Sequence, residues 1–268
     1  MIKPEIDVVI VAKNESLRLG SALAALSDQD YPHELLHVYV VDNDSSDSTA
    51  DLARSHGATV IRHSGTVAAA RNAGIRSGHG QIVSFIDAHC IVDRGWVREI
   101  VAAFKSDDIG GCMGPIIQRC DHSLVQQLMR DSIFADSKSL LMHTLEAVTA
   151  PYPWMPTGNC AYRREALSSA GLFNEALTYC EDTDMSWRVV GSGYLMAYSP
   201  QAKVIHHESA LVIRYLLKQF NYGRGAADLA NLYGFNGARK GARGGSAGRH
   251  LLSFCHLLGY RFGQLMRR

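Results

Sequence analysis

The chain has 268 residues, of which 47% are hydrophobic and 20% are charged. A chain of this length and composition can bury a sizeable core, so disordered and low-complexity proteins are excluded. The formal net charge of +1 hides an asymmetry, because residues 1–228 hold 20 basic and 26 acidic groups, whereas the seven charged residues beyond them are all basic.

The first hundred residues alternate between two kinds of segment. Four short runs are almost continuously apolar and rich in β-branched residues, which is typical of buried parallel strands; they are residues 6–12, 36–42, 58–63 and 81–87. Three segments with helical spacing lie between them, and the last two end at glycine; they are residues 15–29, 46–57 and 66–78. The alternation predicts a doubly wound, Rossmann-like α/β sheet, whose ligands bind beyond the carboxyl ends of the strands.

The pattern changes after residue 105. A helix over residues 95–105 leads to a glycine-broken strand over 109–117, and three prolines between positions 151 and 156 mark an irregular loop before a short strand over 160–162. The other elements that we expect are a helix, two short strands and a long amphipathic helix, over residues 181–193, 194–200, 202–207 and 211–234. The pattern as a whole predicts a mixed α/β sheet with a helical C-terminal extension.

Polar residues collect where three of the predicted strands end. Asn14 and Glu15 follow the first strand, Asp42 follows the second, and Asp87 and His89 follow the fourth. Taken singly, Asn14 and Asp42 are more often turn or helix-cap residues than ligands. Because the strand ends meet at one edge of the sheet, their coincidence there predicts a binding site.

Asp87 and His89 stand two residues apart at the tip of the fourth strand. Two ligands at that spacing can meet one cation from the same side, and a carboxylate with a neutral imidazole suits Mn²⁺ better than Ca²⁺. The alternative is a turn with a capping aspartate and a solvated histidine. A third ligand is available in His206, which shares a strand face with Val204 and which we therefore favour over His207, although a histidine there can equally be structural.

Three acids, Glu181, Asp182 and Asp184, crowd the start of the predicted helix over residues 181–193. Acids at a helix N-terminus complement the helix dipole, and Arg188 follows Asp184 at ion-pair spacing, so a structural role explains them. Crowding also raises the pKa of at least one carboxyl group, which can then serve as a general base. Spacing alone leaves both interpretations open.

Six segments occur in an order and at separations that resemble the inverting family-2 glycosyltransferases of GT-A fold. They are VVIVAKNES, VVDNDSSDST, AAARNAGIRSGHGQIVSFIDAHC, TGNCAYRREALSSAGLFNEAL, EDTDMSWRVVGSGY and AKVIHH. The likeness covers residues 6–207 and is specific as a set. It implies a GT-A catalytic domain over 1–207, with a nucleotide-sugar-binding half over 1–115 and an acceptor and catalytic half over 116–207, followed by a helical, basic extension over 208–268.

The resemblance also implies roles for individual residues. The residues implied to contact the nucleotide sugar are Ala12, Asn14, Glu15, Asp42, Arg71 and Asp87. The implied catalytic base is Asp182, with Glu181 beside it. The residues implied on the acceptor side are Trp154, Gly158 and Asn159.

The metal motif departs from the common pattern of the family, which has Asp-x-Asp where this chain has an Asp-x-His motif at Asp87 and His89. That motif resembles the one in polypeptide N-acetylgalactosaminyltransferases, in which a later histidine completes the Mn²⁺ site. The implied ligands of Mn²⁺ or Mg²⁺ are therefore Asp87, His89 and His206. Two smaller departures are Asn43 where a second aspartate is common and Val11 where a proline is common.

The reaction implied by the resemblance is direct displacement at an anomeric carbon. One sugar moves, with inversion, from a nucleoside-diphosphate sugar, UDP-sugars being favoured, to an acceptor that carries a hydroxyl or a thiol. The acceptor stays open among glycans, lipid-linked carriers, peptides and small molecules. The Gln-x-x-Arg-Trp motif of processive members is not found around Gln219, which favours a hexosyl- or N-acetylhexosaminyltransferase that moves a single sugar.

Three other classes of protein share parts of this pattern. A non-catalytic nucleotide-sugar-binding or scaffold protein would keep Asp42 and Asp87 but needs no base, so the Glu181-Asp182 pair argues mildly against it. A sugar-nucleotide nucleotidyltransferase would carry a glycine-rich, basic loop after the first strand, and a dehydrogenase would carry Gly-x-Gly-x-x-Gly there. The sequence VAKNESLRLG has neither loop.

The basic end of the chain has its own pattern. Residues 249–268 combine arginines with apolar residues at helical spacing, namely Leu251, Phe254, Leu258, Phe262 and Leu265. An interfacial helix on an anionic membrane has this pattern, and so does a helix packed on the catalytic domain or on a partner subunit.

Location is predicted from what the sequence lacks. The six cysteines form no CxxC pair, the N-terminus has no signal-peptide pattern, and no apolar run reaches the ~18 residues of a membrane-spanning helix. We therefore expect a cytoplasmic protein that is not integral to a membrane, peripheral at the inner face of the plasma membrane if residues 249–268 bind lipid, with no nucleic-acid partner.

Overall fold

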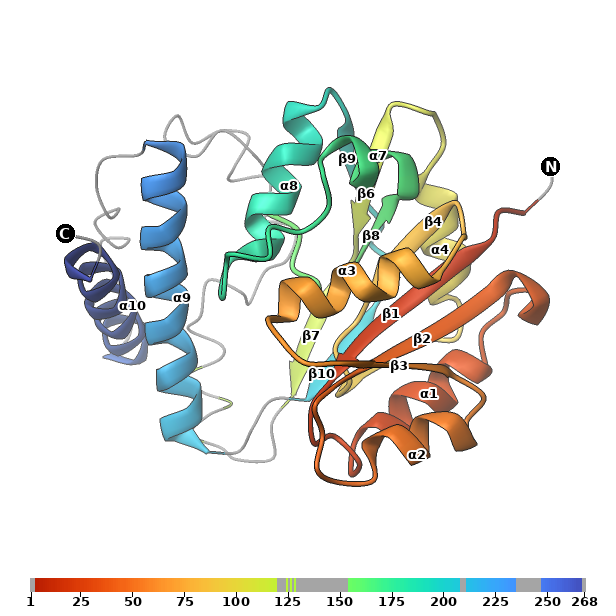
Figure 1. The fold of residues 1–268 in the computed structure, drawn as a ribbon, viewed down its shortest axis with the longest axis horizontal. Helices are drawn as coiled ribbons and strands as arrows, with labels where there is room; N and C mark the ends of the chain where they lie inside the picture. The colour runs from red at the N-terminus through yellow and green to blue at the C-terminus, as the bar shows by residue number, and fades with distance from the viewer. Residues whose placement is uncertain are drawn as a thin grey trace.

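The computed structural model describes residues 3–119, 154–207, 211–234 and 247–266, together with Leu124, Gln126 and Leu128. Within these residues a mixed β-sheet forms the centre, helices cover both of its faces, and two long helices lie to one side (Figure 1). The predicted class, a mixed α/β fold of GT-A type with a Rossmann-like first half and a helical extension, is confirmed. Residues 151–153 of the predicted proline loop lie outside the described residues, and residues 154–159 form neither helix nor strand.

The central sheet has seven strands in the described part of the chain, in the order β3-β2-β1-β4-β8-β6-β9. They are β1 (Ile6–Ala12), β2 (Leu36–Asn43), β3 (Thr59–His63), β4 (Ile82–Phe85), β6 (Ile109–Met113), β8 (Cys160–Arg163) and β9 (Leu195–Tyr198). The first four are parallel, β8 runs antiparallel to β4 and β6, and β9 is parallel to β6. We call the side where β1, β2 and β4 end the carboxyl edge, and the side where they begin the amino edge.

Both faces of the sheet are covered, which explains why the strands are apolar at nearly every position. The helices on the two faces, with one short 3-10 helix, are α1 (Leu19–Ser27), η1 (His33–Leu35), α2 (Thr49–Ser55), α3 (Val67–Ser77), α4 (Trp96–Ala103), α7 (Arg164–Ser169) and α8 (Glu181–Gly191). Ile6, Val8 and Ile10 of β1 belong to one core cluster with residues of α1, α2 and α4, whereas Val9 belongs to a second cluster with residues of α3, α7 and α8.

A second, three-stranded sheet lies next to the carboxyl edge, and it is this sheet that builds the candidate site. Its order is β5-β10-β7, where β10 is antiparallel to β5 and parallel to β7. The strands are β5 (Cys90–Val92), β7 (Ile116–Arg119) and β10 (Val204–His207).

Two local predictions differ from the structure. The expected strand over residues 109–117 is two strands in different sheets, because Pro115 lacks an N–H for the ladder and a Cβ on Gly114 would lie 1.9 Å from the Ala202 carbonyl oxygen. The strand expected to reach Asp87 ends at Phe85. In addition, α7, η1 and β5 were not predicted.

Two long helices follow the second sheet, α9 (Val212–Tyr233) and α10 (Ala247–Leu265), and Figure 1 shows α9 between α10 and the rest of the described structure. Glycines let the two helices approach closely, because a Cβ on Gly259 would lie 1.8 Å from the carbonyl oxygen of Phe220, and one on Gly263 would meet Ala227 at 2.9 Å. Among the helices described, none combines the length and hydropathy required to cross a bilayer.

Candidate active site

A turn at the carboxyl edge carries the first two residues of the predicted metal motif. The N–H of Cys90 donates to the carbonyl oxygen of Asp87 at 2.9 Å, so the chain turns after β4 and continues as β5. Ala88 is buried in the core beneath the turn. Because neighbouring residues alternate, Asp87 and His89 both lie on the other, partly exposed side.

The pairing of β10 with β5 brings His206 to this turn from 117 residues away. His206 lies opposite Cys90, and the N–H of His207 donates to the carbonyl oxygen of His89 at 3.2 Å. The Nε2 atoms of His89 and His206 are 3.0 Å apart, and Nε2 of His206 is 3.4 Å from Oδ2 of Asp87. The structure therefore brings together the three expected residues, and His206 rather than His207 completes the cluster.

This set of donors fits a divalent cation. One atom from each of Asp87, His89 and His206 lies within 4.8 Å of the other two, and imidazole nitrogens that face each other need a shared proton or a cation between them. Nδ1 of His206 is buried and has no hydrogen-bond partner in the described part of the chain, so no hydrogen bond at that atom fixes the orientation of the ring. A carboxylate with two imidazoles suits Mn²⁺ and similar ions.

Burial and charge act on these groups in opposite directions. Burial raises the pKa of Asp87, but the hydrogen bond with His206 and the charges of His89 and Arg71 outweigh it and hold that pKa below its ordinary value. Burial lowers the pKa of His206, which favours the neutral ring that binds metal. Burial also lowers the pKa of His89, but its contact with Glu15 and the charge of Asp87 raise it above the ordinary value overall.

The three residues expected on the acceptor side have different surroundings. A Cβ on Gly158 would lie 3.2 Å from Oδ2 of Asp87, so glycine leaves room for that carboxylate. Trp154 lies beside Asp182 and lowers its pKa. Asn159, in contrast, is fully buried, and its amide bonds to three groups of the fold: Trp96 Nε1, Pro115 O and Ala202 O. The Asn159 side chain thus holds the loop in place and does not face the site.

The loops after β1 and β2 are tied together at the carboxyl edge. Asn14, in a left-handed conformation with φ 55°, donates its N–H to Ser45 Oγ at 2.9 Å and accepts from the N–H of Ser46 at 2.9 Å. Asp42, which pairs with Ala12 in the sheet, is buried and accepts from the N–H of Ser45 at 3.2 Å. These contacts are those of turn residues, and they form the rim of the same edge.

The acids at the start of α8 separate into three distinct environments. Glu181 forms a buried ion pair with Arg71 of α3, so its charge is balanced. Asp184 is fully buried, 2.6 Å from Arg188 and 2.7 Å from the Tyr233 hydroxyl. Asp184 is therefore structural, in agreement with the ion-pair interpretation of that residue.

Asp182, the third of these acids, has a raised pKa. Burial and the neighbouring charge of Glu181 raise its pKa to about 6, although Arg71, Trp154 and the N–H of Thr183 act in the opposite direction. The negative charges of Glu181, Asp87 and Asp182 in turn raise the pKa of Arg71. A carboxyl group of this kind is ionised at neutral pH yet basic enough to accept a proton.

Two contributions were not predicted from the sequence. Oε1 of Glu15, expected only at the nucleotide, lies 3.7 Å from Nδ1 of His89. Lys218 of α9 lies close enough that its charge lowers the pKa of both His89 and His206. Neither contact has a local sequence signal, because each joins segments far apart in the chain.

The fold and this edge define a GT-A glycosyltransferase, and comparisons with known proteins agree. The profile of the family described as Glycosyl transferase family 2 matches residues 7–170. The chain therefore belongs to glycosyl transferase family 2.

One curated relative is the glycosyltransferase AglE of Haloferax volcanii, 26% identical over 240 residues, which cover 83% of this chain and 73% of AglE. Two longer curated relatives are the pre-mycofactocin glycosyltransferase of Mycobacterium tuberculosis, 27% identical over 235 residues (84% of this chain), and the probable glycosyltransferase YdaM of Bacillus subtilis, 23% identical over 223 residues (74% of this chain). The chain spans about half of their length, 47% and 50%. These names and the family together establish a glycosyltransferase.

Solved structures that share the fold include a mannosyltransferase and the protein GalNAc-T7. The mannosyltransferase PcManGT of Pyrobaculum calidifontis, in complex with GDP-Man and Mn²⁺, superposes with a TM-score of 0.70 at 18% identity, covering 99% of this chain and 73% of PcManGT. GalNAc-T7 with UDP, GalNAc and Mn²⁺ superposes with a TM-score of 0.59 at 18% identity, covering 83% of this chain and 47% of GalNAc-T7.

The raised pKa of Asp182 predicts a pH-dependent cost to stability. The pKa of Asp182 is about 6 in the folded chain and 3.8 as its ordinary value in the unfolded chain, so ionisation costs more free energy in the folded state. At a pH above 6, where Asp182 is ionised in both states, this difference lowers the stability of the fold. Asp182→Asn should therefore raise the free energy of unfolding at pH 8 by up to about 3 kcal/mol, the gain shrinking as the pH falls through 6 and vanishing below about 4. Urea unfolding at pH 8 and pH 5 measures this, with the exposed Asp51→Asn as control; equal gains at both pH values would contradict it.

Proposed function

We propose that this glycosyltransferase is metal-dependent and inverting, and that it moves a single sugar from a nucleoside-diphosphate sugar to an acceptor. The observation that carries the proposal is the position of Arg71, whose pKa is raised by the negative charges of both Asp87 and Asp182. A ligand set for a divalent ion and a carboxyl group with raised pKa therefore lie within electrostatic reach of one guanidinium. Such a neighbourhood suits a reaction that separates a charged leaving group from a base.

Asp182 has the properties of the general base in this proposal. With a pKa of about 6, it is ionised near pH 7 and can take the proton of an acceptor hydroxyl or thiol. The acceptor atom then bonds to the anomeric carbon while the bond from that carbon to the diphosphate oxygen breaks, and one such step inverts the centre. Glu181 supports Asp182 through its negative charge, and it stays paired with Arg71.

The leaving-group side falls to Asp87, His89 and His206. A Mn²⁺ or Mg²⁺ ion held by these residues would neutralise the charge of the departing diphosphate. Lys218, a cation whose charge acts on both histidines, is suited to the same phosphates. Asn14, Glu15, Ala12 and Asp42 at the rim are assigned to the nucleoside and ribose, and a UDP-sugar remains the favoured donor.

The acceptor side has less support. Trp154 beside Asp182 offers an aromatic surface for an acceptor, and Gly158 leaves space at the site. We assign residues 1–207 to the GT-A catalytic domain, with halves at 1–115 and 116–207, and residues 208–268 to the helical extension. The non-catalytic nucleotide-sugar-binding protein considered from the sequence is set aside by the family match and by the relatives, which are glycosyltransferases.

Asp182→Asn should lower the rate of sugar transfer by a factor of about 10² or more, because no general base then takes the proton from the attacking hydroxyl or thiol. Binding of the nucleotide sugar should be unchanged, since Asn keeps the shape of the side chain. The measurement is nucleoside-diphosphate release with a panel of sugar nucleotides, alongside titration of the same donors. Asp51→Asn serves as the control; undiminished turnover in Asp182→Asn would remove Asp182 from its assigned role.

His89→Ala and His206→Ala should each raise the Mn²⁺ concentration needed for half-maximal activity by about tenfold or more, because each removes a ligand. A thermal-shift titration of UDP with and without Mn²⁺ gives a second readout that is independent of the acceptor. His207→Ala, one residue along β10 but outside the cluster, is the matched control. If all three variants titrate alike, the ligand assignment is wrong.

We also propose that α10 lies on an anionic membrane surface. It packs along α9 through Gly259 and Gly263, yet four of its apolar residues stay exposed: Phe254 at 57%, Leu258 at 44%, Phe262 at 43% and Leu265 at 69%. The side chain of Leu251 lies outside the residues whose burial is described. Packing on α9 thus leaves apolar surface free for lipid, and the chain beyond Asp228 carries only positive charges.

A triple variant in which serine replaces Phe254, Leu258 and Leu265 should no longer float with anionic vesicles, while α10 should stay packed on α9. The wild-type chain should float with phosphatidylglycerol vesicles and less with phosphatidylcholine, and salt should weaken the binding. Circular dichroism checks that the helices persist. Equal flotation of the variant and the wild type would show that α10 does not hold the membrane.

A further inference from the structure

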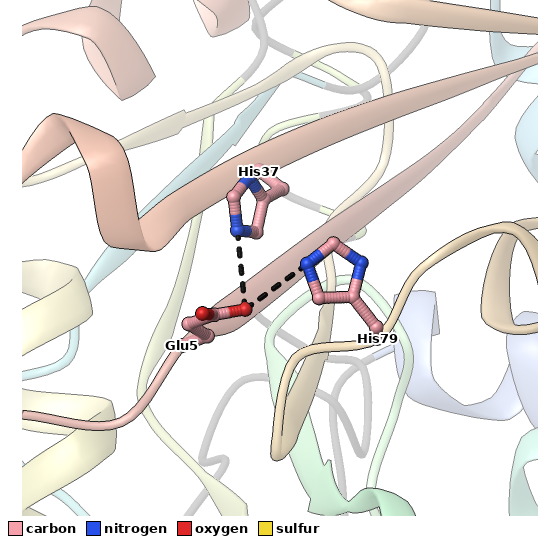
Figure 2. Close-up of side chains that lie close together, drawn as sticks. All are labelled: Glu5, His37 and His79. Atoms are coloured by element: carbon pink, nitrogen blue, oxygen red, sulfur yellow. Dashed lines mark ion pairs between the residues drawn. The ribbon is translucent and has the colours of Figure 1, made fainter.

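A second cluster of side chains of the kind that bind metals lies at the amino edge, at the opposite end of β1 from the candidate active site. It consists of Glu5, His37 and His79 (Figure 2). Oε2 of Glu5 is 3.5 Å from Nε2 of His37 and 3.1 Å from Nε2 of His79. At about 3.3 Å per residue, the length of β1 separates this cluster from the carboxyl edge by about 20 Å.

Figure 2 shows both imidazole rings directed at the same carboxylate oxygen of Glu5. The ring centroids of His37 and His79 are 5.0 Å apart and the planes are tilted by 41°, so the rings converge on that oxygen without stacking face to face. Nε2 of His37 is buried and has no hydrogen-bond partner within the described residues. One carboxylate oxygen therefore faces two imidazole nitrogens, and a single cation lying between these three atoms would bind all three groups.

The backbone around each ligand is held by contacts that do not involve a metal. Glu5 is fixed to the start of β4, because its N–H donates to Gln81 Oε1 at 2.6 Å and its carbonyl oxygen accepts from the N–H of Ile82 at 3.3 Å. His37 is fixed by β2, where it pairs with Asp7 of β1.

The loop that carries His79 is fixed from beneath. The N–H of Gly80 donates to Oδ2 of the fully buried Asp7 at 2.9 Å, and Nε of Arg164 donates to the Gly80 carbonyl oxygen at 2.7 Å. A Cβ on Gly78 would lie 2.1 Å from Oδ2 of Asp7, so only glycine fits there. The loop geometry is thus set by the fold, and the three ligands meet in a preorganised arrangement.

We propose that Glu5, His37 and His79 bind a Zn²⁺ ion. Two imidazole nitrogens and one carboxylate oxygen are ligands that Zn²⁺ prefers, and three protein ligands leave a fourth position for water. The His79 side chain is 69% exposed, which gives an ion access from solvent. The ion would join the segment before β1, the strand β2 and the loop before β4, so its role is to stabilise the amino edge and not to take part in sugar transfer.

The test is Zn²⁺ titration by calorimetry, combined with anomalous diffraction at the zinc edge. His206→Ala is the background, because it disables the cluster at the carboxyl edge. In that background the chain should bind one Zn²⁺ and melt at a higher temperature with Zn²⁺ than with EDTA. Adding His37→Ala or His79→Ala should weaken binding by about tenfold or more and remove the increase in melting temperature.

His33→Ala in the same background is the matched control, since His33 is exposed and outside the cluster. If His37→Ala lowers the melting temperature even in EDTA, the substitution destabilises the fold without involving a metal. The test then rests on His79→Ala, because His79 is exposed. Loss of the anomalous peak at Glu5 in His79→Ala supports the proposal. No Zn²⁺ binding in the background protein, or titrations of His79→Ala and His33→Ala that coincide, would overturn it.

Discussion

The antiparallel pairing of β10 with β5 is the constraint on which the candidate active site depends. It aligns His206 with Cys90 and thereby sets the ring of His206 against that of His89, with Asp87 on the same side of the turn. A shift of one residue in this register would turn His206 toward the other face and bring His207 in its place. The strand pairing, and not the short Asp-x-His spacing, therefore determines which residues can share a cation.

Electrostatic balance at the edge is the second constraint. Arg71 is buried, and its charge is compensated by Glu181 in direct contact and by Asp87 and Asp182 at longer range. Because Glu181 takes the ion pair, Asp182 experiences the repulsion of Glu181 together with its own burial, and its pKa rises to about 6. Asp87 has comparable burial but lies against two histidines, so its pKa falls. One fold thus holds two aspartates with opposite shifts, which is how acid–base and ligand roles can be separated.

The sequence predicted what depends on local pattern. The strands around residues 6–12, 36–42 and 58–63 and the position of His206 followed from apolar runs and period two, and the structure agrees. Pattern and structure differ where tertiary contacts decide: the strand expected over 109–117 divides at Gly114, and the side chain of Asn159, expected on the acceptor side, bonds to Trp96 in the core. The charge of Lys218 acts on His89 and His206 from a distant segment, and Glu5, His37 and His79 meet from segments with no common spacing, so no motif could have revealed either arrangement.

The two ligand clusters differ in what their surroundings allow. At the carboxyl edge, Asp87 and His89 lie on a turn between two sheets, and their third partner, His206, comes from a strand of the second sheet. The distances within this cluster therefore depend on how the two sheets are placed relative to each other. At the amino edge, the ligands belong to segments already locked by Asp7 and Arg164. In parallel sheets the loops at the carboxyl ends are the ones available for binding and chemistry, whereas the amino ends chiefly affect stability. A cation at the amino edge would thus change how firmly the sheet is held while leaving the geometry around Asp182 unaltered.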